Sequence, residues 1–316
     1  MSTVLNAVSE LDHVPGPVVL AIGVFDGVHI GHQAVIGRAM ADANRANGSA
    51  VVVTFDPHPA RLLRPDKAPR LLTDTAHKTE LISRIGVQWI LILPFDQSLA
   101  AQPPVDFIES LAHACKPLHE ICVGHEWSFG KGRAGNLDLL RELGSRLGFE
   151  EVGLPAIKSG DLIVSSTAVR NALEHGDLDA ARALLGRPYA LRGSVVHGSQ
   201  LGREIGFPTA NLQLSNEQLP PDGVYCVHVR HASGTHGGVL NIGIRPTLGL
   251  PNPVRTAEAH LLDFSADLYG ATLEIHLLSK IRDERKFEDL AALQAQIGRD
   301  ITRARTLLAN TAQPPA

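Results

Sequence analysis

Hydrophobic residues in the first half of the chain form short runs that are separated by helical patterns. Apolar runs occupy residues 18–25, 49–56, 89–96 and 120–124, and residues 32–48 show the spacing of a helix. Short runs that alternate with helical segments predict βαβ units, whose parallel strands are buried on both faces. The first half of the chain is therefore predicted to be a doubly wound α/β domain that ends near Gly186.

The pattern changes after residue 185. Glycine and proline separate strand-like runs at 189–198, 223–229, 237–244, 256–264 and 271–278, with no helical pattern between them. Such spacing predicts an antiparallel barrel or sandwich. The last segment, 287–310, returns to helical spacing and places four apolar residues on one face, namely Leu290, Leu293, Ile297 and Ile301. We predict an α/β plus β protein with domains 1–186 and 187–316, the second an antiparallel barrel with a C-terminal helix packed against it.

Composition narrows the class of protein. Hydrophobic residues make up 44% and charged residues 20% of the 316 positions, which is typical of globular domains. A net charge of −4 gives no reason to expect a nucleic acid or an anionic membrane as partner. The cysteines, Cys115, Cys122 and Cys226, are too few for a disulfide scaffold or a four-ligand zinc site. With no secretory signal and no apolar run of about 20 residues, we expect a cytoplasmic protein; its oligomeric state does not follow from the sequence.

The segment at 21–33 predicts a phosphate-binding turn. A buried strand ends between Gly23 and Phe25, a tight turn follows, and a helix begins near Gly31. The start of a helix offers unpaired backbone N–H groups and the positive end of the helix dipole to an anion. Gly31 has no side chain to keep a phosphate away from the backbone.

Two histidines, His29 and His32, lie three residues apart in the same segment. Their imidazoles can face one side and donate hydrogen bonds to charge that develops on a transferred phosphate. Taken alone, the pair would also suit an ordinary surface or a metal site, although no third zinc ligand lies at a familiar spacing.

Two further segments carry groups suited to phosphate binding. The run at 49–56 leads into His58, and ligands of open α/β sheets lie outside the carboxyl ends of the strands. Ser166 and Thr167 precede a helical run, with Arg170 one turn in, which suits a phosphate clamp. The alternatives are a structural histidine and a plain helix cap.

The segment at 193–212 suggests a second nucleotide site without a P-loop. Thr209 and Asn211 are two residues apart on an extended segment, so both side chains point to one side. Their oxygens could share a Mg²⁺ ion, although an ordinary turn would contain the same residues. The candidate backbone positions around them are Gly198, Gly202, Gly206 and Pro208.

A carboxylate is needed if a hydroxyl group is to attack a phosphate, because the hydroxyl loses its proton. Glu258, in the strand-like run at 256–264, is the candidate. Taken alone, it could equally lie on the solvent face of a strand.

The segments GVFDGVHIGH, TFDPHP, VGHEWSFGKGRAGN and VSSTAVR together resemble the FMN adenylyltransferase module of the bacterial bifunctional riboflavin kinase/FAD synthetase family. The resemblance implies that His29 and His32 contact the ATP phosphates. It also implies that Ser166, Thr167 and Arg170 hold the triphosphate, and that the loop beginning at Gly124 lines the flavin or adenine side.

The Gly124 loop departs from the family pattern. Family members usually have a short acid or amide followed by phenylalanine, and arginine is common directly after the phenylalanine. This chain has Glu126, Trp127 and Ser128 there, whereas Phe129 and Arg133 still fit. A riboflavin kinase with a weak or lost adenylyltransferase site is therefore an alternative.

The segments GREIGFPTANL, PPDGVYCV, NIGIRPT, AEAHLLDF, DLYG and LSKIRDERKF resemble the riboflavin kinase module of the same family. The resemblance implies that Thr209 and Asn211 bind ATP and Mg²⁺, and that Glu258 is the catalytic base. It further implies that Arg282 contacts ligand and that three residues support the fold, namely Asp263, Tyr269 and Phe287.

Together the two resemblances imply an enzyme that uses ATP twice, first to phosphorylate riboflavin to FMN and then to adenylylate FMN to FAD. A nucleotidyltransferase for another acceptor is a second possibility, because the histidine pair does not determine which molecule accepts the nucleotide. A non-catalytic flavin-binding regulator is a third, but it predicts loss of the candidate catalytic groups, all of which are present. The histidines at 113, 119 and 125 are interpreted as structural or exposed rather than as a metal site.

Overall fold

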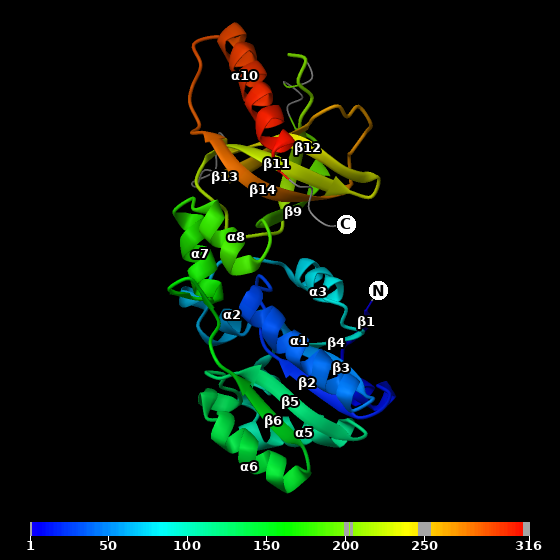
Figure 1. Cartoon of the computed structure of the whole chain (residues 1–316). Helices are drawn as coiled ribbons and strands as arrows, with labels where there is room; N and C mark the ends of the chain where they lie inside the picture. Colours follow the sequence, from blue (N-terminus) through cyan, green and yellow to red (C-terminus); the bar gives the residue numbers. More distant parts are fainter. Residues whose placement is uncertain (1, 199–201, 203–204, 246–253, 312–316) are drawn as a thin grey trace. The chain divides into compact units, whose positions relative to one another are not determined.

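The computed structural model describes residues 2–198, 202, 205–245 and 254–311 (Figure 1). It contains two compact units, Met1–Ser166 and Thr167–Ala316. The predicted domain boundary after Gly186 lies beyond two helices, α7 (Ser166–Glu174) and α8 (Leu178–Leu185). In the described part of the chain, no helix combines the length and the apolar character needed to cross a membrane.

The first unit contains a parallel sheet with the strand order β1-β4-β3-β2-β5-β6. Its strands are β1 (Thr3–Leu5), β2 (Val18–Ile22), β3 (Ser49–Asp56), β4 (Trp89–Pro94), β5 (Leu118–Gly124) and β6 (Glu150–Leu154). The predicted parallel sheet is confirmed, and the apolar runs correspond to its central strands.

Helices cover both faces of this sheet because alternate strand residues point to opposite sides. Val19 and Val52 pack with α1 (Ile30–Arg45) and α3 (Thr75–Arg84), whereas Leu20 and Val53 pack with α5 (Pro104–Ala114) and α6 (Leu137–Leu147). Shorter elements complete the unit: η1 (Val8–His13), α2 (Pro59–Leu63), η2 (Pro65–Lys67), α4 (Gln97–Ala101), η3 (Lys131–Arg133), β7 (Lys158–Ser159) and β8 (Leu162–Ile163).

The strand order reverses between β2 and β5. The chain passes from β2 to β3 and β4 on one side, then returns to place β5 and β6 on the other. Ligands of open α/β sheets bind at such a switch point, outside the carboxyl ends of the strands. The segments that follow β2 and β5, around residues 23–32 and 124–136, therefore occupy the position expected of a binding site.

The second unit contains a closed antiparallel barrel with the strand order β10-β13-β12-β11-β14-β9. Its strands are β9 (Ala190–Val196), β10 (Ala210–Leu214), β11 (Gly223–His231), β12 (Gly234–Arg245), β13 (Val254–Leu261) and β14 (Thr272–Arg282). β9 pairs with both β10 and β14, which closes the barrel. The predicted barrel is confirmed.

Helix α10 (Leu290–Ala309) packs against β11, β12 and β14 and is drawn in red in Figure 1. Asp289 caps its first turn by accepting a hydrogen bond from the Ala292 N–H at 2.7 Å. Leu293, Ile297 and Ile301 line a cavity, as an apolar helix face should, whereas Leu290 at the first position is 49% exposed. The predicted C-terminal helix and its packing are confirmed.

Candidate active sites

The loop at residues 23–32 follows β2 and is fixed by a buried hydrogen-bond network. The Asp26 carboxylate is 4% exposed and accepts hydrogen bonds from the backbone N–H groups of Leu72 and Thr73 at 3.0 to 3.2 Å. The Thr73 hydroxyl in turn accepts the Gly27 N–H at 3.1 Å. Phe25 and Val28 have φ angles of 55° and 42°, which residues with a side chain rarely adopt. The network holds a backbone path that the sequence alone does not favour.

His29 and His32 lie at the start of α1 with their rings stacked, the centroids 3.5 Å apart and the planes at 18°. His29 is the N-cap residue, and its Nδ1 accepts the backbone N–H of His32 at 3.2 Å. A neutral His29 therefore carries its proton on Nε2, which makes that atom a donor. Gly31 lies between them in the first turn, and Gly23 donates its N–H to the Val53 carbonyl at 3.1 Å.

His58 and Ser166 also belong to the first unit. His58 is the N-cap of α2 and accepts the Ala60 N–H at 3.1 Å. Ser166, the first residue of α7, donates its hydroxyl to the Asp26 carbonyl at 2.9 Å, so the structure joins it to the 23–32 loop. Thr167 and Arg170 follow on α7 and fall in the second unit. Their predicted contact with a triphosphate stays a prediction.

The loop after Gly124 contains the three residues that depart from the family pattern. Trp127 stacks on Phe129 with ring centroids 4.4 Å apart, and its backbone N–H donates to the Gly124 carbonyl at 2.9 Å. Ser128 accepts a hydrogen bond from Arg133 Nε at 2.7 Å. Glu126 is exposed. The chain thus accommodates the larger aromatic ring on the side of its own core.

In the barrel, three polar residues form a row across neighbouring strands. Asn211 on β10 is paired with Glu258 on β13, and Glu258 is paired with Asn241 on β12. Directly opposed residues have Cβ atoms about 4.5–5.5 Å apart. The predicted metal ligand and the predicted base are therefore neighbours, and all three residues line one cavity. Asn241 was missed in the sequence, although a lone amide in the apolar run at 237–244 was a usable signal.

Two glycines allow Asn211 and Thr209 to lie where they do. A Cβ at Gly198 would lie 2.2 Å from Asn211 Nδ2, and a Cβ at Gly202 would lie 2.5 Å from the Phe207 carbonyl and 3.0 Å from Thr209 Oγ1. Any side chain at either position would therefore displace the candidate ligands. Nearby, the Pro208 carbonyl lies 2.8 Å from His260 Nδ1, and Gly206 has a left-handed φ of 84°.

Two cavities meet at Thr209. The larger, of about 430 Å³, is lined by the row of polar residues and by apolar side chains of β11, β12 and α10. The smaller, of about 260 Å³, is lined by Pro208, Thr209, Phe264 and Tyr269. Tyr269 stacks on His197 with ring centroids 4.0 Å apart. Tyr269 and Phe287, which were predicted to support the fold, each line a cavity, whereas Asp263 forms an ion pair with Arg305 at 2.6 Å.

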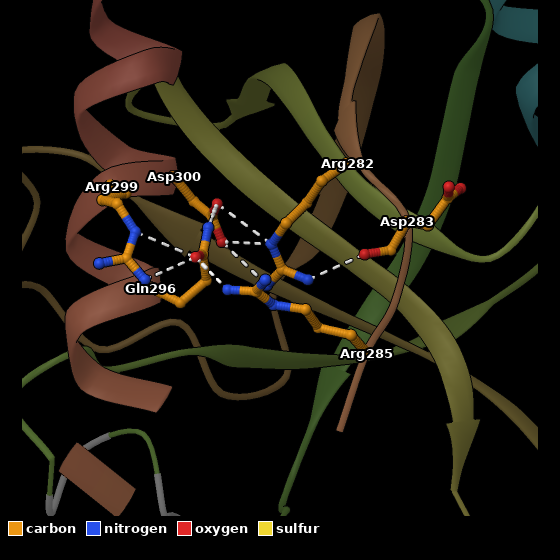
Figure 2. Close-up of polar contacts among 6 residues, drawn as sticks. All are labelled: Arg282, Asp283, Arg285, Gln296, Arg299 and Asp300. Atoms are coloured by element: carbon orange, nitrogen blue, oxygen red, sulfur yellow. Dashed lines mark hydrogen bonds and ion pairs between the residues drawn. The ribbon is translucent and has the colours of Figure 1, made fainter. Parts of the chain in front are cut away.

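Arg282 lines the larger cavity but is bound to α10, as Figure 2 shows. Its Nε lies 3.1 and 3.0 Å from the two carboxylate oxygens of Asp300, its Nη2 lies 2.9 Å from Asp300 Oδ2, and its Nη1 donates to the Asp283 carbonyl. Gln296 Nε2 donates to the same carboxylate at 2.7 Å, and Gln296 Oε1 accepts hydrogen bonds from Arg285 and Arg299. The predicted contact of Arg282 with ligand stays a prediction, but its guanidinium has a fixed place in the wall.

The donors in the larger cavity suit a hard cation. Thr209, Asn211, Asn241 and Glu258 all offer oxygen atoms, which Mg²⁺ prefers, and none of the described residues that line this cavity carries a thiol. Among the described residues, the only cluster of three His, Cys, Asp or Glu side chains close enough to share a metal ion is Asp42, Glu120 and Cys122. That cluster is buried, and Asp42 already pairs with Arg38 and Arg45. The histidines at 113, 119 and 125 belong to no such cluster.

Comparison with known proteins identifies the family of both halves of the chain. A family model described as FAD synthetase matches residues 12–168, and one described as riboflavin kinase matches residues 185–308. A bifunctional riboflavin kinase/FMN adenylyltransferase from Escherichia coli (strain K12) is 41% identical over 289 residues, which cover 91% of each chain. This chain belongs to the bifunctional riboflavin kinase/FMN adenylyltransferase family. Proteins of the same name from Pseudomonas fluorescens and Bacillus subtilis are 38% and 37% identical and cover 93% and 89% of this chain, and 94% and 90% of their own.

A solved structure titled macrolide-efflux protein, from Streptococcus pneumoniae, is 28% identical with a TM-score of 0.82 and covers 96% of this chain and 98% of its own. This likeness supports the fold. The efflux named in that title concerns that protein only. Family membership confirms the predicted enzyme with a riboflavin kinase domain and an FAD synthetase domain. The alternatives, a kinase without the second activity and a non-catalytic regulator, are not favoured.

Proposed function

We propose that the two reactions of the family take place at the two sites described above, riboflavin phosphorylation in the barrel and FMN adenylylation at the 23–32 loop. Riboflavin, FMN, FAD and ATP are then the substrates and products. The observation that supports the kinase assignment best is the row Asn211–Glu258–Asn241, because it places a carboxylate between two amide side chains in the wall of the larger cavity.

The two cavities suit two different substrates. The larger one is lined by Phe207, Val239, Leu293 and Ile297, which offer the apolar surface that an isoalloxazine ring would bury. The smaller one, with Tyr269 stacked on His197, suits the purine of ATP. Because Thr209 lines both, the flavin hydroxyl and the γ-phosphate would meet beside it.

In the kinase step, Glu258 accepts the proton of the ribityl 5′-hydroxyl while the hydroxyl oxygen attacks the γ-phosphorus of ATP. The bond from that phosphorus to the bridging oxygen breaks, and ADP leaves. Thr209 and Asn211, with Asn241 beside Glu258, are the residues that would hold Mg²⁺. Mg²⁺ would neutralise the charge that accumulates on the phosphate oxygens.

In the adenylylation step, a phosphate oxygen of FMN attacks the α-phosphorus of ATP, and pyrophosphate leaves. No general base is needed because a phosphate monoester is already ionised near pH 7, its second pKa being about 6. His29 Nε2–H, His32 and the first N–H groups of α1 would stabilise the charge on the phosphates. Ser166, whose hydroxyl donates to the Asp26 carbonyl of the same loop, would hold the rest of the triphosphate, and the roles predicted for Thr167 and Arg170 stay predictions.

The test is chromatography of flavin products after incubation of the full chain with Mg-ATP and either riboflavin or FMN. The wild type is expected to make FAD from both. Glu258→Gln is expected to lower FMN formation by about 10²- to 10⁴-fold, the usual contribution of a general base, and to leave FAD formation from FMN unchanged. Glu217→Gln, the same change at an exposed glutamate between β10 and β11, is the matched control.

Two outcomes would contradict the assignment. If Glu258→Gln phosphorylated riboflavin as fast as Glu217→Gln, Glu258 would not be the base. If the folded Glu258→Gln protein lost both activities, the two reactions would not have separate sites.

A further inference from the structure

Lys78 on α3 is a buried cation at the carboxyl edge of the parallel sheet, and the mechanism above does not use it. Its side chain is 5% exposed, and its Nζ donates to the backbone carbonyls of Phe55 at 3.1 Å and Val24 at 3.3 Å. Phe55 is the penultimate residue of β3, and Val24 lies just after β2. A single ammonium group thus joins the ends of the two central strands, β2 and β3, of which β2 borders the switch point of the sheet.

The bond to Val24 acts on the most constrained part of the 23–32 loop. The Val24 carbonyl also accepts the Thr54 hydroxyl at 3.0 Å, so residue 24 is held from both sides. The next residue, Phe25, is 1% exposed and has the left-handed φ of 55°. Three residues further on, Val28 repeats this conformation just before His29. The direction in which His29 leaves the loop therefore depends on the backbone at residue 24.

A buried lysine lowers the stability of the fold, because the charged form loses its hydration. Burial lowers the pKa of Lys78 from its ordinary value to about 8, and the carboxylates of Asp26 and Asp56 partly oppose this effect. A methionine would fill the same space without a charge. A residue that lowers stability, at a position that an apolar residue could fill, is expected where function requires that residue.

We propose that Lys78 is a positioning residue for adenylyl transfer, which holds the ends of β2 and β3 so that the 23–32 loop presents His29 and the start of α1 to the ATP phosphates. The proposal rests on the assignment of adenylyl transfer to that loop. Lys78 touches no reacting atom. Its ammonium acts through the Val24 and Phe55 carbonyls.

The test compares Lys78→Met with Lys116→Met in the full chain. Methionine keeps the length of the side chain and removes the charge in both. Lys116 precedes β5 at the opposite edge of the sheet, is 65% exposed and pairs with Asp12, so its loss should be nearly neutral. The kinase activity of the same molecules serves as an internal control.

Four quantities are measured for each variant. They are kcat for FAD formation from FMN, kcat for FMN formation from riboflavin, the unfolding midpoint of the first unit, and hydrogen exchange of the 23–32 backbone. Both tryptophans of the chain, Trp89 and Trp127, lie in the first unit, so tryptophan fluorescence follows its unfolding.

For Lys78→Met we expect kcat for FAD formation to fall by about 10- to 100-fold, the effect of misplaced reacting groups. Exchange should rise within residues 23–32, whereas the kinase rate and the unfolding midpoint should not fall. Lys116→Met should match the wild type in all four. A lysine with a purely structural role would instead lower the midpoint together with the activity.

Either of two results would overturn the proposal: FAD formation by Lys78→Met as fast as by Lys116→Met, or a loss of activity matched by a loss of stability. If Lys78→Met does not fold, Lys78→Gln, which also removes the ammonium group, takes its place in the same four measurements, and the same two results would overturn the proposal. Wild-type protein that made no FAD at all would instead refute the proposed function.

Discussion

In the first unit, the groups proposed to bind ATP come mainly from one stretch of chain, residues 23–32, whereas in the barrel they come from three neighbouring strands. The loop would bind ATP through backbone N–H groups, through His32 and through His29, which caps α1, and buried partners far along the chain fix its shape. The barrel site works through side-chain oxygens that only strand register brings together. A site built on one loop should tolerate little change in its supports, whereas a site built on a rigid barrel should tolerate more.

After Glu258→Gln, the largest effect that separates the two regions is expected from His32→Ala. Loss of a donor to the transferred phosphate should lower FAD formation from FMN by about 10²- to 10³-fold and leave riboflavin phosphorylation unchanged. His113→Ala, the same change at an exposed histidine of α5, is the control. Rate measurements with each flavin check this, and equal rates for the two variants would remove His32 from the site.

The next effect concerns the barrel and its C-terminal helix. Asp300→Ala leaves the Arg282 guanidinium without its carboxylate and should lower the free energy of unfolding of the second unit by about 3 kcal/mol. Kinase activity should therefore be lost at a lower denaturant concentration than in the wild type, and FAD formation from FMN should be retained. Asp283→Ala, which removes an exposed carboxylate nearby, should cost much less. Equal stability of the two variants would contradict this account of α10.

Lys78 should make the stability of the first unit depend on pH. Its pKa of about 8 in the folded chain lies below the ordinary value of 10.5, so the unfolded chain binds more protons between these values and stability rises with pH there. Relative to Lys78→Met, the free energy of unfolding of the first unit of the wild type should rise by about 2 kcal/mol between pH 7.5 and 9.5. Denaturant titrations at the two pH values measure this, and a constant difference would show that the burial of Lys78 does not shift its pKa.

The smallest effect is expected from Asn241→Ala in the barrel row. Removal of one amide beside Glu258 should slow FMN formation by about 10-fold through a lost hydrogen bond to a charged group or metal ligand. Gln213→Ala, at an exposed position of β10, is the control. If Asn241→Ala is as active as the control, the row ends at Glu258.

The same contrast explains what the sequence could predict. The parallel sheet, the barrel and the 23–32 loop followed from local patterns, because strand periodicity and a turn before a helix are encoded within a few residues. Thr73 and Lys78 were missed because their partners lie between 23 and 54 positions away. Asn241 was missed because only register joins it to Glu258. Thr209 and Asn211 were predicted as ligands because they are two residues apart on one extended segment.

The central claim is that two independent sites in one chain make FAD from riboflavin, and a mixing experiment tests it most directly. Glu258→Gln and His32→Ala are each incubated alone with riboflavin and Mg-ATP, and then together. Alone, each should make FAD at least about 10²-fold more slowly than the wild type, and His32→Ala should accumulate FMN. Together they should make FAD much faster, at a rate that depends on both concentrations, because free FMN passes from one protein to the other. If each variant keeps its remaining activity but the mixture still makes no FAD from riboflavin, the two sites do not act independently and the account is contradicted.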